Sequence, residues 1–230
     1  MTPLVLIPGM MCDARLFMPQ IAAFSGRRTL ICAPISDRPC IEELAKNVLT
    51  NAPPLFALAG VSMGGIVAME ILRQAPHRIE RIALLDTNPL AETDAVKARR
   101  FHQLASVKAG DLATVMRDEM KPNYLTNGSK REEILSLCMD MALDLGPHVF
   151  LTQSRALQDR PDQTVTLRNA SLPALVLCGR DDTLCPVTRH ELIADLIPGS
   201  RLQVIEGAGH LPTLEQPELT NKAFARWLEN

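Results

Sequence analysis

A serine stands between glycines in the segment GVSMGG, residues 60–65. The segment follows an apolar run at residues 55–61 and opens a helical pattern at residues 64–75. A sharp turn from strand to helix exposes the side chain at its tip, and the glycines remove Cβ atoms that would clash there. This context predicts that Ser62 is an exposed nucleophile. The simpler alternative is an ordinary tight turn with a buried serine.

A serine hydroxyl is a weak nucleophile and needs a base to accept its proton. His210, one of five histidines, lies in a glycine-rich segment directly after the last apolar run. The carboxyl ends of parallel strands share one edge of a sheet, so His210 is expected beside the Ser62 turn. Surface or packing roles are favoured for the other four: His77, His102, His148 and His190.

The base in turn needs a carboxylate that fixes its tautomer and stabilises the imidazolium. Asp181 and Asp182 both follow the apolar run at residues 174–178, and Asp86 follows the run before it. For Asp86, a carboxylate that binds loop amides is the favoured role. The residues themselves leave the choice between Asp181 and Asp182 open.

Apolar runs rich in β-formers start at residues 4, 29, 55, 79, 174 and 202, with helical patterns between most of them. This alternation indicates an α/β fold with a mostly parallel sheet. The interval from 79 to 174 is the longest and reads as helices, with a break at Gly146 and Pro147. It predicts a helical cap, residues 90–170, over the carboxyl ends of the strands, where ligands bind in open α/β sheets. Residues 1–89 and 171–230 are expected to form the core.

Three segments together resemble the α/β-hydrolase superfamily: GVSMGG, GRDDTLCP at 179–186, and GAGHLPTLEQPE at 207–218. The resemblance covers nearly the whole chain and is closest to short, cap-bearing serine hydrolases of the esterase and enol-lactonase branch. It implies about six strands, because the two antiparallel strands that usually come first have no counterpart here. It also selects Asp182 as the acid, since the family's acid lies three residues after the glycine and four before the proline.

The resemblance further implies an oxyanion hole. The family places one backbone donor in a His-Gly-x segment after the first long strand, which here is PGM at residues 8–10. The second donor follows the nucleophile. The expected donors are therefore the N–H groups of Met10 and Met63, and a proline in place of the histidine leaves a backbone donor intact. Such a site needs neither a metal nor another cofactor.

The resemblance implies hydrolysis of small to medium carboxylic esters through an acyl-enzyme. Met11 and Ile66 are expected to line the acyl site with Met10 and Met63, and adaptable methionines favour acyl groups without a charged anchor. Basic cap residues could instead hold a substrate carboxylate: Arg99, Arg100, Arg117 and Arg155. The cap methionines extend the lining or belong to the core: Met116, Met120, Met139 and Met141.

Other activities fit the same residues. An acyltransferase, lactonase, thioesterase or C–C hydrolase would use the same triad, and a non-catalytic ligand receptor would use the same cavity. A serine nucleophile argues against the dehalogenases and epoxide hydrolases, which resemble the fold but use aspartate.

Composition excludes several other classes. The 230-residue chain is 47% hydrophobic and 22% charged, as expected of a globular protein. A formal net charge of -2 and 3% aromatic residues argue against nucleic acid as a partner. Six cysteines without a C-x-x-C pair indicate reduced thiols and no zinc site.

The charge-free stretch at residues 47–69 contains prolines and glycines, so it is interpreted as a buried strand and helix, not as a membrane span. No signal peptide is recognisable at the N-terminus. We expect a cytoplasmic monomer or homodimer that acts on a small ester-type molecule and binds no membrane.

Overall fold

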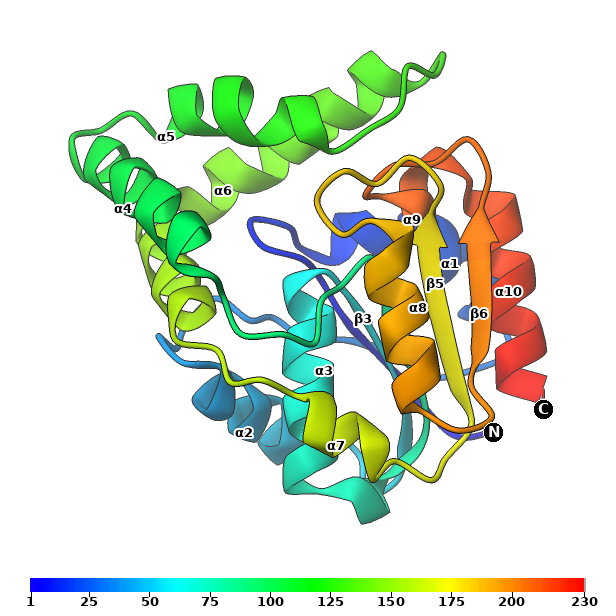
Figure 1. The fold of residues 1–230 in the computed structure, drawn as a ribbon. Helices are drawn as coiled ribbons and strands as arrows, with labels where there is room; N and C mark the ends of the chain where they lie inside the picture. The colour runs from blue at the N-terminus through cyan, green and yellow to red at the C-terminus, as the bar shows by residue number, and fades with distance from the viewer. Residues whose placement is uncertain (230) are drawn as a thin grey trace.

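The computed structural model describes residues 1–229 and contains a six-stranded sheet in the order β2-β1-β3-β4-β5-β6 (Figure 1). Every neighbouring pair of strands is parallel. The strands are β1 (Leu4–Ile7), β2 (Leu30–Cys32), β3 (Phe56–Val61), β4 (Ile79–Leu85), β5 (Ala174–Gly179) and β6 (Arg201–Ile205). The predicted α/β sheet of about six strands is confirmed.

Helices cover both faces of the sheet, because alternate residues of a strand point to opposite faces. Along β1, Val5 and Ile7 enter a hydrophobic cluster shared with α2, α3 and α8, whereas Leu4 and Leu6 enter a second cluster shared with α1 and α10. These helices are α1 (Met18–Phe24), α2 (Ile41–Asn51), α3 (Met63–Gln74), α8 (Val187–Leu196) and α10 (Pro217–Glu229). Shorter turns accompany them: η1 (Ala14–Phe17), η2 (Pro76–Arg78) and α9 (Pro212–Glu215).

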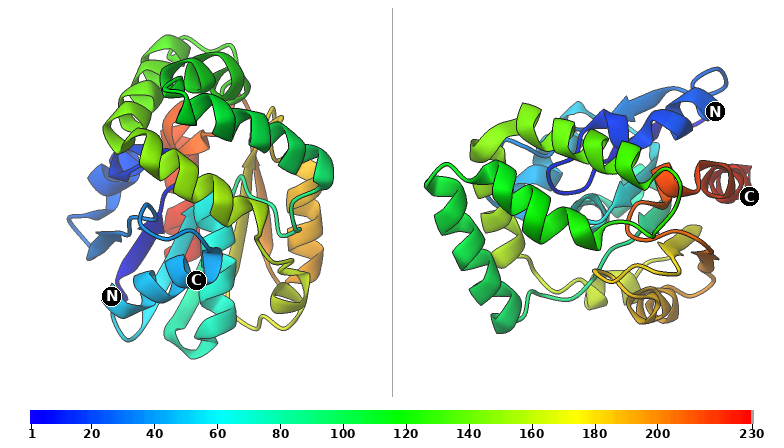
Figure 2. Two further views of the ribbon diagram at one scale, coloured as in Figure 1. Left: turned by 90° about the vertical axis from the view of Figure 1, so that its left-hand side faces the viewer. Right: turned by 90° about the horizontal axis from the view of Figure 1, so that it is seen from above.

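A helical cap lies between β4 and β5 in the sequence and above the carboxyl ends of the strands (Figures 1 and 2). Its elements are α4 (Asp94–Lys108), α5 (Leu112–Thr114), the π-helical turn η3 (Val115–Met120), η4 (Lys121–Asn123) and α6 (Arg131–Gln158). The chain leaves helical geometry at Gly146, with φ 80° and ψ 175°, so α6 is kinked where the sequence predicts a break.

The range predicted for the cap also includes a helix that packs on the core. Helix α7 (Thr164–Arg168) lies against α3 and α8, far from the carboxyl ends of the strands (Figure 1). Just before it, the Gln163 side chain donates a hydrogen bond to the buried Glu70 of α3 (2.8 Å). The chain therefore returns to the core before residue 170.

Helix α6 is long and apolar enough, by length and composition, to cross a membrane. It is nevertheless kinked at Gly146, and its buried residues Met141 and Phe150 belong to the two hydrophobic clusters of the core. The charge-free stretch at residues 47–69 forms the end of α2, strand β3 and the start of α3, as predicted.

Candidate active site

Ser62 occupies the sharp turn between β3 and α3, with φ 54° and ψ -116°. For a residue other than glycine, such a backbone conformation costs about 1–3 kcal/mol, so the surrounding structure must hold it in place. The Ser62 N–H donates to the Leu85 carbonyl at the end of β4 (2.9 Å), and the Thr87 hydroxyl donates to the Ser62 carbonyl (2.7 Å). The neighbouring strand thus fixes the strained turn.

Glycines let three segments meet around Ser62. A Cβ on Gly60 would lie 2.2 Å from the Gly64 carbonyl oxygen, and a Cβ on Gly64 would lie 2.1 Å from that of Ile7. The first turn of α3 therefore packs directly on the end of β1. A Cβ on Gly9 would lie 3.4 Å from the Ser62 Cβ, so the loop of residues 8–10 passes beside the serine.

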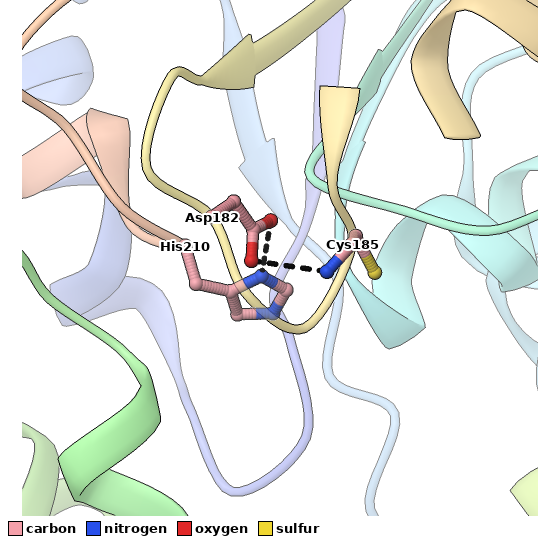
Figure 3. Close-up of side chains that lie close together, drawn as sticks. All are labelled: Asp182, Cys185 and His210. Atoms are coloured by element: carbon pink, nitrogen blue, oxygen red, sulfur yellow. Dashed lines mark hydrogen bonds and ion pairs between the residues drawn. The ribbon is translucent and has the colours of Figure 1, made fainter. Parts of the chain in front are cut away.

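His210 and Asp182 meet at the carboxyl ends of β6 and β5. The His210 Nδ1 lies 2.8 Å from the Asp182 Oδ2, and both residues are buried (Figure 3). The Leu184 and Cys185 amides donate to the Asp182 Oδ1 (2.8 and 3.0 Å). Burial opposes ionisation of Asp182, but the His210 ring and the two amides outweigh it and hold the pKa of this carboxyl below its ordinary value.

The structure separates the three candidate acids. The Asp181 side chain is exposed, and its backbone N–H donates to the Ala208 carbonyl (3.0 Å). Asp86 is fully buried and accepts the Gly179 N–H (2.9 Å), which is the amide-binding role predicted for it. Burial, and then the charge of Asp182, raise the pKa of Asp86 well above its ordinary value. Asp182 is the one of the three that contacts His210.

Ser62 and His210 line one cavity of about 400 Å³, together with Met10, Met63 and Ile66. A cavity of this size suits a small molecule. Within residues 1–229, no hydrogen bond joins the Ser62 and His210 side chains. Such contacts are often loose until substrate binds.

The expected oxyanion donors both lie next to Ser62. Met63 is the first residue of α3, so its N–H has no acceptor inside the helix. Met10 follows Gly9 in the loop beside the serine, and its N–H finds no acceptor in the described part of the chain. Two free amides beside a nucleophile are what an oxyanion hole requires.

One expected lining residue has to be corrected. Met11 is 1% exposed, belongs to the hydrophobic core and does not line the cavity. The backbone turns at this residue, with φ 55°, and its N–H donates to the Gln153 side chain of α6 (2.8 Å). Gln153 also donates to the Ile35 carbonyl (3.0 Å), so it ties the cap helix to Met11 and to the segment after β2. No motif in the sequence reveals this role.

Comparison with known proteins identifies the family. A family model described as the alpha/beta hydrolase family matches residues 4–223. The chain belongs to the alpha/beta hydrolase family. It is accordingly an enzyme of the α/β-hydrolase class, as the three segments around Ser62, Asp182 and His210 predict.

The similar proteins include named esterases. The hydrolase is 27% identical over 194 residues to a pimeloyl-acyl-carrier-protein methyl ester esterase of Aromatoleum aromaticum, covering 78% of this chain and 76% of that protein. It is 27% identical over 192 residues to the biotin biosynthesis bifunctional protein BioHC of Teredinibacter turnerae, covering 77% of this chain but 34% of that protein. A malate-bound thermophilic esterase from Thermogutta terrifontis has a TM-score of 0.90 and 25% identity, covering 100% of this chain and 90% of that one.

The rest of the cavity wall comes mostly from the cap. Of the cap arginines and cap methionines considered from the sequence, three line the cavity: Arg99, Arg100 and Met120. Arg117 and Arg155 are exposed outside it, and Met116 and Met141 are buried in the core. The wall also contains residues without any sequence signal: Asn88, Glu92, Gln103, Glu119, Asn123, Tyr124, Arg160 and Cys185.

Asp182, Cys185 and His210 place potential metal-ligand atoms within 4.8 Å of one another (Figure 3). Both oxygens of Asp182 already accept hydrogen bonds. Burial raises the pKa of the Cys185 thiol well above its ordinary value, whereas a thiolate is needed to bind a metal. A metal would have to displace the bond between Asp182 and His210, so these donors fit an acid–base pair better than a metal centre.

Glu215 connects the His210 loop to the cap. Its Oε2 accepts the Gly209 N–H (2.8 Å), and its Oε1 accepts the Thr126 N–H (2.8 Å). The His210 N–H in turn donates to the Tyr124 carbonyl of the cap (2.7 Å). One carboxylate therefore fixes the histidine loop and the cap segment above it.

Glu215→Gln is expected to lower kcat about tenfold, with a smaller change in KM, because the amide offers one acceptor oxygen instead of two and His210 loses alignment. Steady-state kinetics on a simple ester would measure this. Glu218→Gln, at an exposed position nearby, is the matched control. An unchanged kcat in Glu215→Gln would show that the loop is positioned by other contacts.

His190 is buried, and its Nε2 accepts the Thr87 N–H (3.0 Å), which requires a neutral ring. Burial lowers the pKa of His190 from 6.5 to about 4. Between these values the unfolded chain binds the proton and the folded chain does not. The contribution of His190 to the free energy of unfolding is therefore fully present above pH 6.5. It is lost as the pH falls towards 4, which lowers the free energy of unfolding by up to about 3 kcal/mol.

Urea unfolding at pH 7.5, 5.5 and 4.5 would measure this loss of stability. His190→Gln removes the titrating ring, so its unfolding free energy should depend less on pH over the same interval. Parallel curves for the two proteins would rule His190 out as the source.

Proposed function

We propose that the enzyme is a serine esterase that cleaves small to medium carboxylic esters through an acyl-enzyme. The buried Asp182–His210 pair, on the same cavity as the strained Ser62, carries the proposal. The named esterases among the similar proteins support an ester as the substrate class. In this proposal the triad is Ser62, His210 and Asp182.

The proposal assigns a residue to each step of the reaction. The His210 Nε2 takes the proton of Ser62 as its oxygen bonds to the ester carbonyl carbon, and Asp182 stabilises the imidazolium. The N–H groups of Met10 and Met63 bind the oxyanion, and one such donor contributes about 10²–10³-fold in rate. His210 then protonates the departing alkoxide, and water, activated in the same way, releases the acid and restores Ser62.

The test combines turnover with covalent labelling. The p-nitrophenyl esters of acetic, butyric and octanoic acid would be hydrolysed by the wild type, with short chains favoured because the cavity is about 400 Å³. A fluorophosphonate should label Ser62, as mass spectrometry of the peptide would show. An unlabelled Ser62, or equal turnover by Ser62→Ala, would overturn the proposal.

The same experiment separates the alternatives. A labelled Ser62 without turnover of simple esters would keep the nucleophile and move the substrate to a lactone, a thioester or a C–C bond. An unlabelled Ser62 with a tightly bound, unchanged ligand would favour a receptor. Ester formation in water–alcohol mixtures would reveal acyl transfer.

A further inference from the structure

Two arginines of the cavity wall share one glutamate. The Arg100 guanidinium donates to both carboxylate oxygens of Glu92 (3.0 and 2.7 Å), and Arg160 donates to one of the same oxygens (2.9 Å). The side chains are largely buried: Arg100 is 11% exposed, Glu92 1% and Arg160 10%. They join the start of the cap to the segment that follows α6.

This part of the wall carries surplus positive charge. Guanidinium groups remain protonated in proteins, so Arg100 and Arg160 contribute two positive charges against one negative charge on Glu92. The other charged residues of the cavity wall, Arg99 and Glu119, are exposed and have opposite charges, so they leave this surplus unchanged. A largely buried, unbalanced charge is costly unless a counter-charge joins it.

Both arginines line the cavity and have guanidinium N–H donors without a strong acceptor. The Arg100 Nη1 contacts only the Met10 sulfur, at 3.8 Å, and a thioether is a weak acceptor. The Arg160 Nε and Nη1 donate to the Leu90 carbonyl and to Glu92, and its Nη2 has no acceptor among residues 1–229. Met10, Arg100 and Arg160 all line the cavity that contains Ser62, and the contact with the Met10 sulfur places the Arg100 Nη1 beside Met10.

We infer that Arg100 and Arg160 form a subsite for a carboxylate of the substrate, so that the preferred substrates are small esters carrying a free carboxylate. A carboxylate accepts hydrogen bonds from guanidinium groups with matching geometry and supplies the missing counter-charge. The inference rests on the proposed esterase function. Of the two alternatives that the sequence leaves open, the inference favours a substrate carboxylate held by cap arginines over an acyl group without a charged anchor.

The chemistry at Ser62 is unchanged by this subsite. Water adds across the ester bond, and the alcohol leaves with the proton from His210. A free carboxylate on the acyl group stays bound to the arginines through both steps, whereas one on the alcohol is bound until the alcohol leaves. The subsite's contribution is to orient the ester, so it should lower KM for acidic esters in particular.

Two pairs of esters test the inference and locate the charge. Monomethyl glutarate carries the carboxylate on the acyl side, and methyl hexanoate has an ethyl group in its place. 3-Acetoxypropionate carries it on the alcohol side, and butyl acetate is its neutral partner. In one of the two pairs, we expect kcat/KM of the acidic ester to exceed that of its neutral partner at least tenfold. That pair shows whether the arginines bind a carboxylate on the acyl side or on the alcohol side of the ester.

Variants connect the preference to the arginines. Arg100→Gln and Arg160→Gln should each reduce the ratio of acidic to neutral kcat/KM at least tenfold, mainly through KM of the acidic ester, and Arg100→Lys should restore part of it. The control is Arg117→Gln, an exposed cap arginine paired with Asp118 outside the cavity, which should keep the wild-type ratio. An equal loss of kcat/KM on the acidic and the neutral ester would mean that the arginines only stabilise the structure and do not bind the substrate.

Binding provides a readout without turnover. Calorimetry should show that Ser62→Ala binds glutarate, and that adding Arg100→Gln weakens this binding at least tenfold. If wild-type Ser62 is labelled by fluorophosphonate but acidic and neutral esters react equally, the subsite is refuted and the esterase function stands. If neither labelling nor turnover occurs while glutarate binds, the esterase function fails instead.

Discussion

Ser62→Ala is expected to lower kcat on a simple ester by about 10⁴–10⁶-fold. Without the hydroxyl there is no acyl-enzyme, and His210 has no nucleophile to activate. The N–H groups of Met10 and Met63 and the cavity itself remain, so slow hydrolysis by water should persist above the uncatalysed rate. Initial rates with p-nitrophenyl acetate, at enzyme concentrations high enough to detect the residual activity, would measure the loss.

The backbone at Ser62 supplies the folding control. Its φ of 54° suits glycine, whereas alanine keeps the Cβ and therefore the strain. Ser62→Gly should thus raise the free energy of unfolding by about 1–2 kcal/mol, while both variants lose activity. Lower stability in Ser62→Gly, or activity in Ser62→Ala above about 1% of wild type, would contradict this account.

Local signals were sufficient to predict most of the fold. Helix α3 spans Met63–Gln74, within one residue at each end of the helical pattern predicted at residues 64–75. The six strands start within one residue of the predicted starts. Gly146 breaks the cap helix as expected, since it adopts a φ of 80° that other residues avoid.

The residues around Ser62 and His210 were predictable for a related reason. Their positions follow from the strand ends, and parallel strands bring those ends together. The cap contacts were not predictable, because they join distant segments: Arg160 meets Glu92 across 68 residues, and Gln153 meets Met11 across 142. The direction of a single side chain, as at Met11, depends on such contacts and not on local periodicity.

Asp182→Asn is expected to lower kcat about 10³–10⁴-fold, whereas Asp181→Asn should stay within about twofold of wild type. Both carboxylates follow β5, so the pair is a matched comparison. Asp182 contacts the His210 Nδ1 at 2.8 Å and is buried, while Asp181 points its side chain to solvent. An asparagine at 182 can offer an N–H to the histidine and so favour the wrong tautomer, and it removes the charge that stabilises the imidazolium.

Asp86→Asn distinguishes this role from a general need for negative charge at the strand ends. Burial and the nearby Asp182 charge raise the pKa of Asp86 well above its ordinary value, which favours the uncharged carboxyl form that an asparagine resembles. Its oxygen can still accept the Gly179 N–H, and kcat should fall less than about tenfold. Equal losses in Asp86→Asn and Asp182→Asn would mean that the two carboxyls share the charge facing His210. A loss confined to Asp182→Asn would assign that charge to Asp182, because of the three carboxyls it alone contacts the imidazole.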